Sequence, residues 1–175
     1  HRDRHAGFAD YSRGLMLPIE RKSVEPLAAH TDPLHVSAKH QSLHHLVAQS
    51  EWSDREVLAC VREWVMPQLG RKSKFYWIVD DTGFPKKGRH SVGVTRQYCG
   101  QLGKQDNCQV AVSLSFASER GSVPIDWRLY LPEVWAKDRR RRKKSGVPTG
   151  VKFLTKPQIA LEQIRAAKAA GVAIG

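Results

Sequence analysis

The hydrophobic pattern of the chain changes near Phe75, and this change constrains the fold more than any other feature. Before Phe75, apolar residues such as Leu43 and Leu46 recur with the spacing of one helix face. After it, runs rich in Val, Ile, Trp and Tyr are typical of β-strands. The pattern therefore predicts a helical region over residues 1–70, followed by a region over residues 71–175 that contains a sheet.

The second region is predicted to hold three strands and then a helix. The segments with strand character are 75–81, 107–118 and 123–132. The tetrapeptide at 118–121 is short enough to join the last two as an antiparallel hairpin. Residues 157–170 have the apolar spacing of a helix, and Gly171 is a typical stop. Because "GVAIG" is then expected to lead into a strand parallel to the first, the sheet is predicted to be mixed and the fold class α/β (α+β).

The charge of the chain predicts a polyanionic partner. The net charge is +12 and the pI is about 10.0, which favours binding to nucleic acid through counterion release. Six cations stand in a row: Arg139, Arg140, Arg141, Arg142, Lys143 and Lys144. Because their segment has no apolar periodicity, it is predicted to be an exposed, extended loop that contacts a phosphate backbone. The alternative is a loop that only keeps the protein soluble.

Two classes of protein are disfavoured by what the sequence lacks. No apolar run approaches the ~18 residues of a membrane-spanning helix, and no signal peptide opens the chain. The cysteines are Cys60, Cys99 and Cys108, an odd number without a C-x-x-C pair, so they are expected to be reduced thiols. These observations predict a soluble, cytoplasmic protein.

The segment "WIVDDTGFPKKG" at 77–88 ends an apolar strand on two adjacent carboxylates, Asp80 and Asp81. A carboxylate at the end of a buried strand needs a hydrogen-bonding partner, an ion pair or a bound cation. Either aspartate could be a turn residue that bonds its own backbone ahead of Gly83. Alternatively, one of them is a ligand of Mg²⁺, which accepts one or two carboxylates and leaves positions for phosphate oxygens. The residues alone leave both interpretations open.

Two long segments carry a resemblance to a known family. Residues 80–117, which begin "DDTGFPKKG", and residues 11–29, "YSRGLMLPIERKSVEPLAA", resemble DDE transposases of bacterial insertion sequences, in particular the IS701-like branch. The resemblance implies that the chain is an N-terminal fragment. It implies a helical DNA-binding or dimerisation region over 1–70 and an incomplete RNase H-like catalytic domain over 71–175.

The same resemblance implies a site of two Asp and one Glu that holds Mg²⁺ or Mn²⁺. Such enzymes cut double-stranded DNA at transposon ends and join it to a target by two-metal phosphoryl transfer. The first acid then corresponds to Asp81, with Asp80 as its rival. The second Asp and the Glu are expected beyond Gly175, so the chain alone is expected not to cleave DNA. The resemblance also implies a homodimer in the bacterial cytoplasm, associated with the nucleoid.

Further cations are candidates for contact with DNA. Lys86, Lys87 and Arg89 follow the first strand closely enough to touch a nearby phosphate, and Arg96 is a candidate backbone contact. A solvated loop is the alternative for the first three. Two other functions remain open: a non-catalytic DNA-binding remnant of a transposase, and another RNase H-like nuclease or resolvase.

Overall fold

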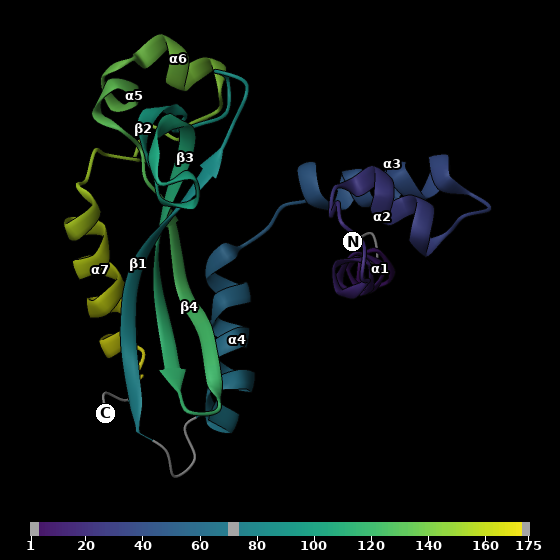
Figure 1. Cartoon of the computed structure of the whole chain (residues 1–175), viewed down its shortest axis with the longest axis horizontal. Coiled ribbons are helices and arrows are strands. Elements are labelled where there is room, and N and C mark those ends of the chain that lie inside the picture. Colours follow the sequence, from purple (N-terminus) through teal and green to yellow (C-terminus); the bar gives the residue numbers. More distant parts are fainter. Residues whose placement is uncertain (1–3, 70–73, 173–175) are drawn as a thin grey trace. The chain divides into compact units, whose positions relative to one another are not determined.

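The computed structural model describes residues 4–69 and 74–172. Contacts divide the chain into two compact units, residues 1–53 and residues 54–175. Each unit has a core of its own, and each is described by itself (Figure 1). None of the helices in the described part of the chain is long and apolar enough to span a membrane.

The first unit consists of three helices, α1 (His5–Met16), α2 (Val24–Thr31) and α3 (Val36–Ala48). They pack around Leu27, Ala28 and Leu43, which are fully buried. Gly14 lets α1 approach α2 closely, because a Cβ there would lie 2.9 Å from a methyl carbon of Leu27. These contacts confirm the helical character that the apolar spacing predicted.

The second unit contains a four-stranded antiparallel sheet with β3 at its centre. The strands are β1 (Phe75–Pro85), β2 (Thr95–Cys99), β3 (Lys104–Ser118) and β4 (Gly121–Leu129). β1 pairs along one side of β3, while β2 and β4 pair with successive parts of its other side. Among the described residues β1 pairs with β3 alone, so the other side of β1 is a sheet edge.

The three predicted strands and their hairpin are confirmed, with longer ends for β1 and β3. β2 was not predicted, because five residues between glycine-containing loops give too short a pattern to identify a strand. Every described strand pair is antiparallel. The parallel strand that would make the sheet mixed was predicted from "GVAIG", of which residues 173–175 lie outside the described residues. It stays a prediction.

Two helices pack against one face of the sheet, α4 (Asp54–Leu69) and α7 (Lys156–Ala169). The shared core contains Leu114, Phe116 and Ile125, with Ala167 from α7 packed against them and Met66 from α4 alongside. Because alternate strand residues point to opposite faces, Val112, Leu114 and Phe116 share the β3 face that these helices cover. The sequence grouped α4 with the preceding helices, whereas its apolar side chains pack on the sheet.

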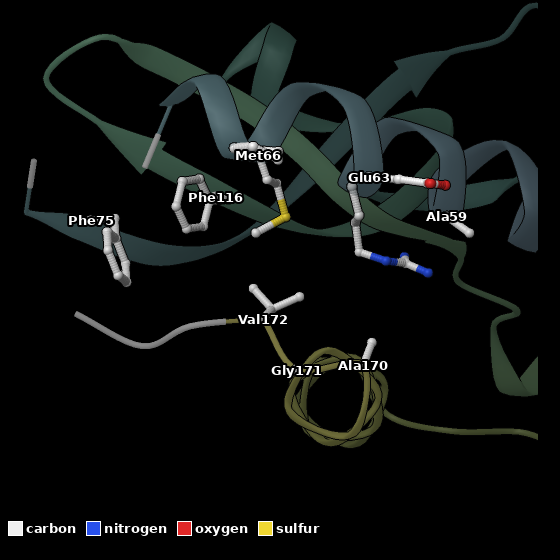
Figure 2. A pocket seen from close by; sticks show the side chains of 10 residues that line it. Ala59, Glu63, Met66, Phe75, Phe116, Ala170, Gly171 and Val172 are labelled. Carbon is white, nitrogen blue, oxygen red and sulfur yellow. The ribbon is translucent and has the colours of Figure 1, made fainter. Parts of the chain in front are cut away.

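A groove lies where α4, the start of β1 and the end of α7 meet. Figure 2 shows Met66, Phe75, Phe116 and Val172 around it. Phe75 is six residues before Asp81 on β1, which corresponds to about 20 Å along a strand. The groove is therefore remote from the paired aspartates.

The predicted helix at 157–170 is confirmed as α7. Its start is a capping box: Thr155 Oγ1 accepts the Gln158 N–H, and Gln158 Oε1 accepts the Thr155 N–H. It ends at Gly171, whose φ of 73° is a left-handed conformation that favours glycine. The Val172 N–H bonds back to the Ala167 carbonyl, which completes the stop.

The prediction of an extended loop for the basic run is wrong. The segment folds into two short helices, α5 (Glu133–Lys137) and α6 (Arg139–Lys144). The Asp138 side chain accepts the Arg141 N–H at 2.8 Å and so caps the start of α6. Arg141 also places its guanidinium carbon 3.6 Å from the centre of the buried Trp135 ring. These tertiary contacts offset the mutual repulsion that an isolated run of cations would experience.

Candidate functional site

The pairing of β1 with β3 sends Asp80 and Asp81 to opposite faces of the sheet. Asp81 lies opposite Val112, which is buried under the helices, and Asp80 lies opposite Ser113. Asp81 therefore shares the helix-covered face, where its side chain keeps 36% of its surface exposed. This position leaves its carboxylate partly desolvated yet accessible.

Asp81 is paired with Lys156, the first residue of α7. Lys156 Nζ donates to Asp81 Oδ2 at 2.9 Å, and the same Nζ lies 5.8 Å from the centre of the Tyr130 ring. The capping box at Thr155 fixes the backbone from which this lysine extends. The sequence analysis did not identify Lys156 as a site residue, because 75 positions separate it from Asp81.

Asp80 makes a local hydrogen bond instead. Its Oδ1 accepts the N–H of Asp81 at 2.8 Å, and its backbone carbonyl accepts the Ser113 hydroxyl at 3.4 Å. The turn that the structural interpretation of the aspartates required is absent, because β1 continues as a strand to Pro85. The two carboxylates are thus in different environments, as expected if only one of them has a functional role.

The described residues contain part of what a divalent cation requires. In residues 4–69 and 74–172, no group of three or more His, Cys, Asp or Glu side chains could hold a metal ion. Asp81 supplies one carboxylate on the helix-covered face, which fits a single ligand of Mg²⁺. Among the described residues, Asp81 is thus a candidate for one ligand, and they do not form a complete site.

Three of the predicted DNA contacts follow β1 directly. Lys86, Lys87 and Arg89 are all exposed in the loop between β1 and β2. The loop is held in place by Asn107, whose amide donates to the Gly88 carbonyl at 2.9 Å. It is held also by Arg141, whose guanidinium donates to the Arg89 carbonyl at 2.7 Å. The structure therefore brings this loop beside α6 (Figure 1).

The six cations of α6 are not equivalent. Arg141 stacks on Trp135, and Arg142 donates to the carbonyls of Pro148 at 2.9 Å and Val151 at 2.7 Å. Both side chains therefore stabilise the local fold. The other four cations are exposed: Arg139, Arg140, Lys143 and Lys144. Together with Lys86, Lys87 and Arg89 they form what we call the basic end of the sheet.

Arg96 is exposed on β2, opposite Asn107 of β3 and near Asp106. The pKa of Asp106 is lowered, first by the hydrogen bond that its carboxylate accepts from the Asn107 backbone and then by Lys104. Asp106 therefore stays ionised, and its negative charge lies close to Arg96. Arg96 in turn contributes to the lowered pKa of Asp106, after Lys104.

Two buried cysteines lie under the basic end. Cys99 and Cys108 pack with Val110, and both are fully buried. Burial, and then the neighbouring Cys99, raise the pKa of the Cys108 thiol to about 11. Cys108 is therefore mostly protonated at neutral pH, where a thiol is a poor nucleophile. This agrees with the expectation of ordinary reduced thiols.

Comparisons with known proteins agree with the features of this site. The sequence model of the family described as DDE superfamily endonuclease matches residues 1–175. The chain is 33% identical over 131 residues to the probable transposase for insertion sequence element IS701 of Microchaete diplosiphon. That alignment covers 75% of this chain and 31% of the relative, so the chain spans about a third of the relative's length. No solved structure matches the chain.

Proposed function

Because the chain belongs to the DDE superfamily endonucleases, we propose that it is part of a transposase that cuts double-stranded transposon ends and joins them to target DNA. Proteins of this superfamily generally use divalent metals, and transposases act on DNA. The observation that carries the proposal is the position of Asp81. Its carboxylate is accessible on the helix-covered face, four residues before the end of β1, where the basic end of the sheet begins.

Each part of the chain then has a role. Asp81 holds and orients Mg²⁺ or Mn²⁺, and the basic end binds the phosphates of the DNA that reaches it. A pair of such ions, when bound, activates the attacking oxygen and stabilises the leaving oxygen. Residues 1–70 serve in DNA binding or dimerisation, and residues 71–175 form the first half of an RNase H-like domain. The second Asp and the Glu come from residues after Gly175.

The test is a cleavage and strand-transfer assay. Full-length protein is incubated with labelled transposon ends and a supercoiled target, with Mg²⁺, with Mn²⁺ or with EDTA. Joined products that require the divalent ion support the proposal. A protein that binds the ends and yields no product with either ion contradicts it. The 175-residue chain, assayed in parallel, is expected to bind DNA and to release no product.

A second candidate is a DNA-binding remnant that has lost its chemistry. It is supported by the exposed cations of the basic end, which can bind phosphates without any metal ion. Such a protein would retain the basic end and bind DNA. It would give no metal-dependent product even at full length, and the assay above separates the two candidates on this point.

The basic end gives a quantitative prediction for DNA binding. The Arg139→Gln, Arg140→Gln double variant should lower the slope of log K against log salt by about 2, because each lost phosphate contact removes about 0.9. Its thermal stability should be unchanged, since both side chains are exposed. Fluorescence anisotropy with a duplex of arbitrary sequence at several salt concentrations measures the slope.

Two matched double variants control for the loss of charge. Arg165→Gln with Lys168→Gln removes two exposed cations from α7 and should leave the slope unchanged. Arg141→Gln with Arg142→Gln removes the same charge from α6 but should lower thermal stability, because both guanidiniums bond backbone carbonyls. Equal slopes for the Arg139→Gln, Arg140→Gln variant and wild type would exclude α6 from the DNA interface.

A further inference from the structure

The ion pair between Asp81 and Lys156 lies at the position that the proposed function gives to a divalent cation. We propose that Lys156 is a positioning residue which holds the Asp81 carboxylate before the ion arrives and which the ion must displace. The proposal rests on the proposed function, because it takes Asp81 as a ligand. It concerns a residue to which neither the family match nor the relative assigns a role.

The geometry indicates that the Lys156 ammonium and a divalent ion would compete for the Asp81 carboxylate. Lys156 Nζ donates to Asp81 Oδ2 at 2.9 Å, which is a direct contact with one of the two oxygens that could bind the ion. Mg²⁺ binds carboxylate oxygens at about 2.0–2.1 Å and carries two positive charges. An ammonium left in contact with the same carboxylate would therefore repel it. Binding of the ion at Asp81 thus requires Lys156 to move away.

The structure allows this movement. The Lys156 side chain is 33% exposed, and an ion pair with that much solvent access is weak enough to be exchanged. The lysine stem is flexible, whereas its backbone is fixed by the capping box at the start of α7. Displacement therefore changes the side-chain conformation alone and leaves α7 in place. The ammonium remains within reach of Asp81 and returns when the ion leaves.

A simpler role would be to tether α7 to β1. The two roles differ in what they predict for metal binding, because a tether contributes to stability only. If Lys156 competes with the ion, its removal must tighten binding at Asp81. If Lys156 is only a tether, its removal lowers thermal stability and leaves metal affinity unchanged or weaker.

The experiment measures Mn²⁺ binding to the full-length protein without DNA, by electron paramagnetic resonance of the free ion at neutral pH. Lys156→Met should tighten binding by about two- to five-fold, the factor expected for removing a partly exposed ion pair. Lys156→Gln, which retains polarity, should behave in the same way. Lys168→Met removes the same charge from an exposed position on α7 and should leave the affinity unchanged.

The Asp81→Asn variant separates failure of this inference from failure of the proposed function. In that background, Lys156→Met should no longer affect Mn²⁺ affinity. If Asp81→Asn weakens binding but Lys156→Met has no effect on the wild-type background, the competition is excluded and Asp81 remains a ligand. If Asp81→Asn itself leaves Mn²⁺ affinity unchanged, the assignment of Asp81 fails, and this inference fails with it.

Discussion

Asp81→Asn in the full-length protein is expected to abolish metal-dependent DNA cleavage, to below the detection limit of a gel assay. The substitution retains the size of the side chain and removes the charge that binds a divalent cation. DNA binding should be intact or slightly tighter, because a negative charge near the phosphates is lost. Cleavage of labelled ends and anisotropy on the same DNA measure the two effects separately.

Asp80→Asn is the matched control, one residue away on the same strand. Its carboxylate lies on the opposite face and bonds the Asp81 N–H, so its replacement should reduce cleavage far less. If Asp80→Asn were inactive and Asp81→Asn cut DNA normally, the metal ligand would be Asp80 and not Asp81. Normal cleavage by both variants would show that the aspartates have no catalytic role.

Trp135→Ala is expected to lower the free energy of unfolding by about 3–5 kcal/mol, the range for truncating a fully buried aromatic residue. Trp135 is fully buried, its Nε1 donates to the Val94 carbonyl at 2.7 Å, and Arg141 stacks on its ring. Removing it leaves a cavity and frees the loop that carries Arg89. Urea denaturation of the 175-residue chain, followed by circular dichroism, measures the loss.

The effect should extend to DNA binding, since Trp135 anchors both parts of the basic end. Trp135→Ala is therefore expected to weaken DNA binding without any change in net charge. Trp64→Ala is the control, because Trp64 is 74% exposed on α4 and its loss should cost less than about 0.5 kcal/mol. Equal destabilisation by the two variants would contradict the packing of α5 against the loop.

Parts of the fold could be predicted because their signals are local. The alternation of Val110, Val112 and Leu114 identified β3, and the short 118–121 turn implied its hairpin with β4. The Thr155–Gln158 pair marked the start of α7, where the structure has a complete capping box. In each case the physical cause lies within one turn or one strand, so the sequence pattern contains it.

The conformation of the basic run could not be predicted in the same way. Six cations in a row repel one another, and an extended loop follows from that repulsion alone. The structure forms α6 because Trp135 offers a ring to Arg141, and because the carbonyls of Pro148 and Val151 accept from Arg142. Those acceptors have no signature in sequence, since every residue has a carbonyl.

The features of the candidate site can be separated in the same way into those that the sequence predicted and those that only the structure determined. The sequence by itself identified two adjacent aspartates at a strand, and the period of two along a strand meant that they face opposite sides. Only the tertiary structure decided that Asp81 faces the helices, through its register with Val112, and that Lys156 is its partner. The reason is physical: register and helix placement come from burying Leu114, Phe116 and Ala167 together, and such long-range packing determines which distant charges meet.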